Sequence, residues 1–294
     1  MEQALLDSSK YRIYSMSLDS RFADQYNNGD TSDYTIRLPS TYRNIARLAL
    51  SSVELPLVEY LFSECHGNTT LRVDVSGTGF QTVDILPGNY EICDLLGVLQ
   101  DSFQAIDASF NVTLLRVPGT LCITSPYPFT IDPLSANASI AARLNYWGLG
   151  YYLGFRTKGP LVAELNPDTN LYSICATALP TLQATPYYLI QVYAPDLLEN
   201  MTHRVSAGCS IPAFAKLVLR DGFYKLQFVD GGDWMRREFT FLAPTNLSQI
   251  RVKLLDPFGA PVDMRRMDWS VTFELYEVVN SRIYSTMSRT YERE

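Results

Sequence analysis

The alternation of apolar and polar residues along many short segments most limits what this chain can fold into. The segment from Ile45 to Leu55 reads IARLALSSVEL and is closed by Pro56, and the segment from Trp269 to Val279 alternates over its whole length. A period of two places successive side chains on opposite faces of a β-strand, so that one face can cover a core. The sequence therefore predicts a mainly β, antiparallel protein.

Turn residues separate the other segments of this kind. Pro39 closes an early strand, Asp221-Gly222 is a strong hairpin signal, and residues 256–259 (DPFG) have the composition of a type I turn. The further strands that we expect are residues 34–38, 70–75, 80–85, 110–117, 120–125, 187–193, 214–220, 223–229, 237–242 and 250–256. Residues 156–185 lack the alternation and are expected to form a connector with room for one short strand.

One segment follows a helical period instead. Its apolar residues have the spacing of one helix face and are Ile92, Leu95, Leu96, Leu99 and Phe103. We expect Asn89 to cap this helix. A shorter helical stretch is expected from Ile140 to Trp147, with Gly148 ending it.

The distribution of the strands along the chain indicates how the domains are organised. A β-β-α-β-β segment separates the first strands from the later ones, and the first strands alone cannot bury their apolar faces. We predict a jelly-roll-like antiparallel β-sandwich made of residues 30–62 and 159–279, with a small α+β domain inserted at 63–158. Strand 34–38 or 45–55 should then pair in the same sheet system as strand 269–279. The alternative is two sandwiches in tandem, divided near residue 160.

The two ends of the chain lie outside the expected strands. Residues 1–29 are predicted to be an N-terminal arm, and residues 280–294 a C-terminal arm. Both segments contain aromatic residues that could anchor on neighbouring subunits. Ordinary frayed termini are the alternative.

Charge and composition argue against several classes of protein. The 294 residues carry 31 acidic and 24 basic side chains, a net charge of −7, which disfavours a nucleic-acid binder. There is no apolar run long enough for a transmembrane helix, and the N-terminal residues do not resemble a secretory signal. The five cysteines show no CxxC pair and are expected to be reduced thiols: Cys65, Cys93, Cys122, Cys175 and Cys209.

The residue types that carry catalysis or bind metals are sparse. His66 and His203 each lie beside turn residues, and a structural role is favoured over metal ligation or base catalysis. We interpret Gly77-Thr78-Gly79 as a hairpin turn and not a nucleotide loop, and residues 230–233 (DGGD) as a solvated turn and not a calcium loop. The sequence thus predicts no catalytic residues, no cofactor-binding residues and no metal site.

Two segments contain neighbouring arginines. Residues 263–268 read DMRRMD, and we interpret them as a self-neutralising surface loop, the alternative being an exposed loop that docks a partner through arginine. Arg236-Arg237, with Trp234 nearby, is a weak indication of nucleic-acid binding in an acidic protein, and nucleic acid is not expected as a partner.

Several short motifs, taken together in their order and spacing, resemble a known family. They are YTIRLP at 34–39, NI at 44–45, SVELP at 52–56, ILPGNY at 85–90, LGF at 153–155, DPFG at 256–259 and DWSVTFELYE at 268–277. From about residue 30 to 280 the layout is similar to minor capsid proteins of nucleocytoplasmic large DNA viruses, the group that includes chloroviruses, marseilleviruses and iridoviruses.

The resemblance implies a structural protein and no enzyme. Its expected partners are the major capsid protein and other minor capsid proteins, with self-association as a further option. The expected location is the inner side of the capsid shell of the virion, assembled in the host cytoplasm. A non-catalytic carbohydrate- or receptor-binding sandwich is the alternative and would show a concave site lined by Trp or Tyr. An enzyme would show a pocket with clustered titratable groups.

Overall fold

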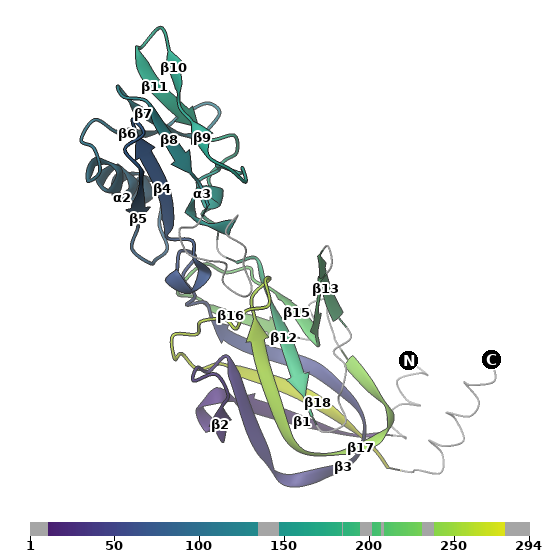
Figure 1. The fold of residues 1–294 in the computed structure, drawn as a ribbon. Helices are drawn as coiled ribbons and strands as arrows, with labels where there is room; N and C mark the ends of the chain where they lie inside the picture. The colour runs from purple at the N-terminus through teal and green to yellow at the C-terminus, as the bar shows by residue number, and fades with distance from the viewer. Residues whose placement is uncertain are drawn as a thin grey trace, which may run out of the picture. The chain divides into compact units, whose positions relative to one another are not determined.

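The structure is a computed structural model that describes residues 11–134, 147–183, 185–194, 202–206, 209–230 and 238–279. It divides into two compact units (Figure 1). We call them the sheet unit, made of Met1–Glu59 and Thr185–Glu294, and the inserted unit, Tyr60–Ala184. Both units consist mainly of antiparallel β-strands, which confirms the predicted mainly β, antiparallel fold class with a small α+β insertion.

The sheet unit is built on one sheet with the strand order β1-β18-β3-β17-β12-β15, and β2 and β16 also pair with β3. These strands are β1 (Tyr11–Asp19), β2 (Gln25–Tyr26), β3 (Asp33–Pro56), β12 (Tyr187–Tyr193), β15 (Ala215–Val218), β16 (Leu226–Asp230), β17 (Glu238–Leu255) and β18 (Ser270–Val278). A short 3-10 turn, η1 (Ser20–Phe22), follows β1, and β13 (Thr202–Ser206) pairs with β14 (Cys209–Ala213). The predicted pairing of an early strand with the last one is confirmed, since Val53 lies opposite Val271 and Leu48 opposite Leu275.

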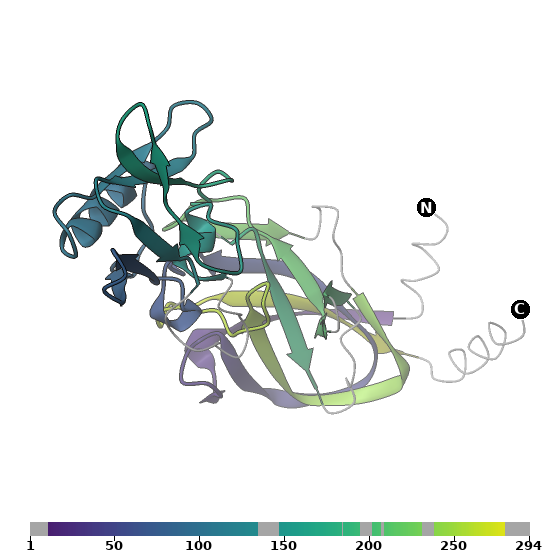
Figure 2. The same ribbon diagram turned by 45° about the horizontal axis from the view of Figure 1, so that its top comes forward.

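The long strands β3 and β17 run side by side and bend together (Figure 1, Figure 2). The prediction that Pro39 ends a first strand is wrong, because the strand continues through a bulged region where the pairing register shifts three times. Asn44 adopts a φ of 53° there, and its N–H donates to Asn246 Oδ1 at 3.2 Å. Bulges tolerate proline and increase bending, so one strand can line both sides of the core.

The core of the sheet unit lies inside this bend. It includes Tyr34, Phe273 and Trp269, whose rings are buried. The Tyr34 and Trp269 rings meet edge to face with centroids 5.4 Å apart, and Phe214 packs in the same way on Phe273 at 5.9 Å. Burial raises the pKa of the Tyr34 hydroxyl well above its usual value, so this group stays neutral as a donor to the Leu18 carbonyl at 3.3 Å.

The predicted N-terminal arm, residues 1–29, extends too far into the chain. Residues 11–19 form β1, which pairs with the whole of β18 from Tyr11 opposite Val278 to Asp19 opposite Ser270. Met16 and Leu18 of β1 are buried in the core, and this burial explains why the segment is a strand. Residues 1–10 and 280–294 lie outside the described residues.

The inserted unit contains two four-stranded sheets, with the orders β10-β11-β7-β6 and β5-β4-β8-β9. Its elements are η2 (Glu64–His66), β4 (Thr70–Val75), β5 (Phe80–Asp84), α2 (Ile92–Gln104), β6 (Asn111–Leu114), β7 (Leu121–Ser125), β8 (Phe129–Asp132), α3 (Leu149–Tyr152), β9 (Leu161–Val162), β10 (Glu164–Asn166) and β11 (Leu171–Cys175). Helix α2 buries Leu95, Leu99 and Phe103 against the sheets, as the helical period predicts. The helical stretch expected from Ile140 lies mostly outside the described residues.

The interpretation of residues 156–185 as a connector is wrong. Strand β11 completes one sheet by pairing with β7, and β9 completes the other by pairing with β8. The compact unit therefore runs from Tyr60 to Ala184 instead of ending at residue 158. These strands are short and weakly alternating, so their pairing partners decide their structure and not their own pattern.

Two local predictions are also corrected. The strands that flank Asp221-Gly222 do not form a hairpin, because β15 pairs with β12 and β16 pairs with β3. Asn89 does not cap α2, whose N-cap residue is Glu91. The Asn89 side chain instead accepts a hydrogen bond from the Leu61 N–H at 2.8 Å.

The expectation that all five cysteines are reduced is wrong for one pair. Cys122 on β7 and Cys175 on β11 lie directly opposite each other and form a disulfide. Cys65 and Cys93 are free and exposed. The two bridged cysteines are far apart in the sequence, so only the strand register brings them together.

Reduction of this disulfide is expected to lower the unfolding free energy of the inserted unit by about 2–4 kcal/mol, because the bridge closes a loop in the unfolded chain. The bridged residues are 53 positions apart. In never-reduced protein, an alkylating reagent followed by mass spectrometry should label Cys65 and Cys93 and spare the bridged pair. A variant with serine at both bridged positions should lose its response to reductant. Complete labelling of Cys122 without reductant would contradict the bridge.

Candidate interaction surface

Those of the residues selected for possible chemistry that the structure describes do not come together in a site. His66 is buried at the end of η2, and His203 lies on β13, where its side chain is outside the described residues. Residues 77–79 form the predicted turn between β4 and β5, with the Gly79 N–H donating to Asp74 Oδ1 at 2.9 Å. Most of the DGGD segment and all of Trp234 and Arg236-Arg237 lie outside the described residues.

Within the part of the chain that the structure describes, no group of three or more His, Cys, Asp or Glu side chains could hold a metal ion. No helix of that part is long and apolar enough to cross a membrane. Several buried polar groups form hydrogen bonds that join parts of the fold. The Tyr188 hydroxyl donates to Glu59 Oε2 at 3.0 Å, and burial, followed by the Glu59 charge, raises the pKa of this tyrosine.

A second buried carboxylate joins two strands of the sheet unit. Asp33 on β3 accepts two hydrogen bonds from the Arg251 guanidinium on β17, at 2.7 and 2.6 Å. This fork-to-fork contact with Asp33 raises the pKa of Arg251. The pair joins β3 to β17 and engages both oxygens of the Asp33 carboxylate within the fold.

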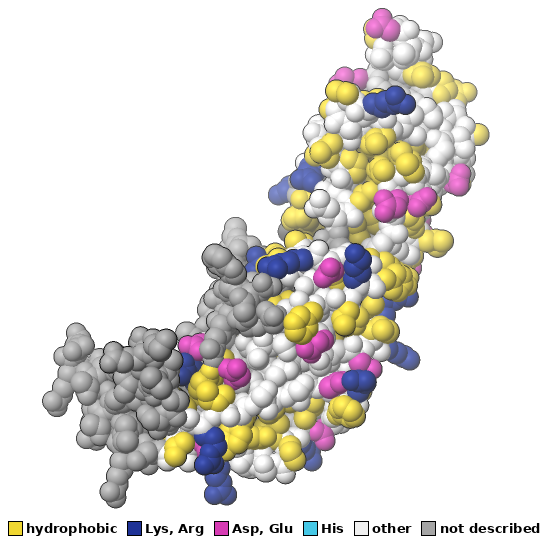
Figure 3. Space-filling model, turned by 180° about the vertical axis from the view of Figure 1, so that it is seen from behind, with side chains coloured by type: hydrophobic (Ala, Val, Ile, Leu, Met, Phe, Trp, Pro, Cys, Tyr) yellow, Lys and Arg dark blue, Asp and Glu magenta, His cyan; other side chains and the backbone are white. Residues whose placement is uncertain are grey.

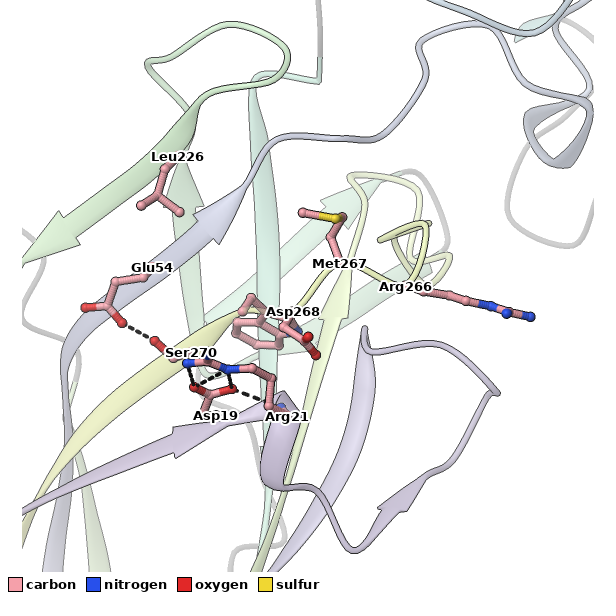
Figure 4. A pocket seen from close by; sticks show the side chains of 9 residues that line it. Asp19, Arg21, Glu54, Leu226, Arg266, Met267, Asp268 and Ser270 are labelled. Carbon is pink, nitrogen blue, oxygen red and sulfur yellow. Dashed lines mark hydrogen bonds and ion pairs between the residues drawn. The ribbon is translucent and has the colours of Figure 1, made fainter.

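A hollow of about 300 Å³ lies at one end of the sheet unit, where β1 ends and β18 begins (Figure 4). It is lined by Asp19, Arg21, Glu54, Leu226, Arg266, Met267, Asp268, Trp269 and Ser270. Leu226 and Met267 supply apolar walls and are 63% and 48% exposed. Trp269 is only 2% exposed, so its ring serves the core and offers no stacking face.

Each carboxylate of this hollow has a partner in the wall. Asp19 accepts from the Arg21 guanidinium at 3.0 Å, and this contact lowers the pKa of Asp19 below its usual value. Glu54 accepts from the Ser270 hydroxyl, and Asp268 accepts from the Ser20 hydroxyl at 2.7 Å. The acidic side chains of the hollow are therefore engaged within the fold.

A turn at the rim of the hollow presents two adjacent arginines. The Met267 N–H donates to the Met264 carbonyl at 2.8 Å, so Arg265 and Arg266 occupy the two central positions of a β-turn. Their φ angles are 52° and 62°. Positive φ at both central positions is the type I′ geometry, which favours Asn-Gly and disfavours residues with long side chains.

Carboxylates on either side hold the backbone of this turn. Asp30, from the segment before β3, accepts from the Met264 N–H at 2.8 Å and from the Arg266 N–H at 3.2 Å. Asp263 accepts from the Arg265 N–H at 2.9 Å. The interpretation of residues 263–268 as a self-neutralising loop is thus incomplete, because these two acidic residues bind backbone groups of the turn.

The Arg266 side chain points away from the other labelled side chains of the hollow (Figure 4). It forms no ion pair with any residue that the structure describes. Arg266 also borders a second hollow of about 360 Å³, lined by Gly29, Asp30, Asp263 and Arg265 besides Arg266 itself. Arg266 is therefore a lining residue of both hollows of the sheet unit.

Large apolar side chains are exposed on regular strands of both units. On β16, Leu226 and Phe228 point outward while Gln227 between them is buried, and within the described residues this strand pairs with β3 alone. In the inserted unit, Val162 on β9 is 72% exposed and Leu165 on β10 is 49% exposed. Figure 3 shows apolar side chains gathered on one face of this unit, with acidic ones at their margin. Exposed apolar side chains in such numbers are typical of contact surfaces.

The sequence identified the DMRRMD segment but not its geometry. Neither arginine position contains the glycine or asparagine that signals a type I′ turn, and Asp30 is more than two hundred residues away in the chain. The hollow was not expected at all, because its walls come from four separate segments.

The sequence matches no protein-family model and no curated protein. Among solved structures, the chain is similar to the mavirus penton protein, with 10% identity, 92% of this chain and 100% of that chain covered, and a TM-score of 0.48. A chain in the structure of the Sputnik virophage is similar with 10% identity, 91% and 98% coverage, and a TM-score of 0.40. With both TM-scores below 0.5, the function of this chain has to be argued from its own residues.

Proposed function

We propose that this chain is a structural component of a viral capsid, a minor capsid protein that joins or stabilises capsomers of the major capsid protein in a large icosahedral shell. It acts through contact area, and its partners are the major capsid protein and other minor capsid proteins. The resemblance carried by the motifs from YTIRLP to DWSVTFELYE supports this proposal.

The observation that carries the proposal is the exposure of large apolar side chains on rigid strands. Leu226 and Phe228 alternate with a buried glutamine on β16, so the strand holds them in defined positions. A preformed apolar surface loses little conformational entropy when a partner covers it. This suits a protein whose work is to hold neighbours together.

The two alternatives have less support from the described residues. A carbohydrate-binding sandwich needs exposed aromatic rings in a concave site, whereas Trp269 in the hollow is buried. An enzyme needs titratable groups aimed at a substrate, whereas Asp19, Glu54 and Asp268 are each engaged in the wall.

The proposal predicts that the chain is found in assembled particles at a constant ratio to the major capsid protein. Quantitative mass spectrometry across a density gradient measures this ratio, and cross-linking identifies the neighbours. Deletion of residues 280–294 should lower incorporation at least fivefold, since we propose that this segment contacts neighbouring subunits. The deletion should leave the circular dichroism of the sheet unit and the inserted unit unchanged.

A variant with residues 280–294 in scrambled order is the matched control for this deletion, because it keeps length and composition. If specific side chains of residues 280–294 contact the neighbouring subunits, this variant should incorporate into particles as poorly as the deletion variant. Absence of the chain from the particle fractions would exclude the capsid role. Loss of a measurable turnover on substitution of residues in the hollow would establish the enzyme alternative.

A further inference from the structure

We propose that the Arg265-Arg266 turn and the adjoining hollow bind an acidic segment of a partner protein. A partner carboxylate lies on the Arg266 guanidinium, and a neighbouring apolar side chain packs against Leu226 and Met267. Such a contact would be one of those by which the proposed capsid component holds its neighbours, and to that extent it rests on the proposed function.

The backbone of the turn is the first argument. Both arginines adopt a left-handed conformation, in which a side chain is sterically disfavoured and glycine is not. A turn of this type is best formed by Asn-Gly, so arginine at both positions opposes the local backbone preference. Residues kept in such conformations are concentrated at functional sites, and here the retained groups are two guanidiniums.

The second argument is that the turn is held rigidly. Met264 before it and Trp269 after it are buried in the core. The Thr31 hydroxyl donates to the Met267 carbonyl at 2.6 Å, and Trp269 Nε1 donates to the Thr31 carbonyl at 2.8 Å. With the backbone fixed from both ends, binding has to order only the arginine side chains themselves.

The third argument is the charge around Arg266. Two acidic side chains contact the turn, Asp30 and Asp263, and both accept hydrogen bonds from its backbone N–H groups. The Asp268 carboxylate accepts a hydrogen bond from the Ser20 hydroxyl, which follows β1. The Arg266 guanidinium has no ion pair with any described residue, and its planar fork matches a carboxylate that accepts two hydrogen bonds.

The hollow determines the chemical class of the partner. Its walls combine exposed Leu226 and Met267 with a lining that includes Asp19 and Glu54. A nucleic acid or an anionic membrane would bring many negative charges against these carboxylates, and the chain itself has a net charge of −7. A peptide with a carboxylate beside an apolar residue can satisfy the guanidinium and cover the apolar walls together.

The test uses the purified full-length chain and a capped pentapeptide in which two glutamates flank a central leucine and the end residues are alanine. Binding is measured by nuclear magnetic resonance titration, with a peptide in which glutamine replaces each glutamate as the neutral probe. We expect Arg266→Gln to weaken binding of the acidic peptide at least fivefold. The control is Arg43→Gln, which removes another exposed arginine of the sheet unit that does not line the hollow and should bind as the wild type does.

A double variant, Arg265→Asn with Arg266→Gly, separates binding from folding. It installs the residues that the turn geometry favours, so its thermal midpoint should equal or exceed that of the wild type while peptide binding is lost. Retention of wild-type affinity in this variant or in Arg266→Gln would overturn the proposal. So would equal binding of the neutral peptide, or tighter Arg266-dependent binding of a single-stranded oligonucleotide or of anionic vesicles.

The outcome is independent of the particle experiment. Arg266-dependent binding of the acidic peptide by a chain that is missing from particles would exclude the capsid role and keep the docking site. A chain present in particles that does not bind the peptide would exclude the docking site and keep the capsid role.

Discussion

Phe273→Ala is expected to lower the unfolding free energy of the sheet unit by about 3–5 kcal/mol. The Phe273 side chain is fully buried on β18, in the core enclosed by the bend of β3 and β17. It lies opposite Leu50 on one side and Met16 on the other, and its ring meets that of Phe214. Three segments far apart in the sequence thus lose contacts at once, and the cavity that remains adds to the lost burial.

Denaturant unfolding with hydrogen exchange read peptide by peptide measures this effect and assigns it to a unit. Protection should fall across β1, β3 and β18 and remain in the inserted unit. Phe228→Ala is the matched control, since the same side chain is 54% exposed on β16 and its removal should cost less than about 1 kcal/mol. Equal losses in the two variants would show that the core is not where the structure places it.

Gly154→Ala is expected to destabilise the inserted unit by about 3 kcal/mol or more. Gly154 follows α3 with a φ of 95°, and a Cβ atom there would lie 2.1 Å from the Ala178 carbonyl oxygen. The same backbone contact includes a hydrogen bond from the Ala178 N–H to the Gly154 carbonyl at 3.2 Å. Alanine therefore suffers both an unfavourable backbone conformation and a clash with main-chain atoms that cannot move without breaking this contact.

The control for this prediction is the same substitution at Gly97. This glycine is exposed within helix α2, and a Cβ atom there would meet nothing within 4 Å. Gly97→Ala should stabilise the inserted unit by about 0.5–1 kcal/mol, because alanine restricts the unfolded chain and favours the helix. The two variants should move the denaturant midpoint in opposite directions. A Gly154→Ala variant as stable as the wild type would contradict the close approach at Ala178.

Features that depend on near neighbours in the sequence were predictable. The stripe of Leu95, Leu99 and Phe103 places one face of α2 in a core, and the glycines around Thr78 reverse the chain between β4 and β5. The DPFG segment closes as expected, with the Gly259 N–H bonded to the Asp256 carbonyl at 3.0 Å. In these cases the residues that determine the structure lie within one or two turns of each other.

Features that depend on distant partners were not predictable from the pattern. Pro39 resembles the end of a strand, yet β3 passes it because β17 supplies a bulged partner. Asp221-Gly222 resembles a hairpin, yet the strand before it pairs with β12 and the strand after it pairs with β3. The Arg265-Arg266 turn depends on the Asp30 carboxylate, which only the folded sheet brings near.

The contacts of the Arg265-Arg266 turn with acidic residues were only partly predictable from the sequence. Acidic residues at 263 and 268 flank the arginines, and we took them as their ion-pair partners. In the structure Asp263 and Asp268 bind a backbone N–H and a serine hydroxyl instead. Charge sums along a segment do not reveal which carboxylates remain available to neighbouring guanidiniums.

The hydrogen bond between Glu59 and Thr185 has a consequence for how this chain could have evolved. The chain leaves the sheet unit after Glu59 and returns at Thr185, and the threonine hydroxyl donates to the glutamate at 3.3 Å. The points of departure and return are thus neighbours within the sheet unit, just outside β3 and β12. A gene segment encoding a different compact module could replace residues 60–184 without any change in strand order, since domains whose ends lie close together are readily exchanged. The same sheet unit could therefore carry different inserted domains in related proteins.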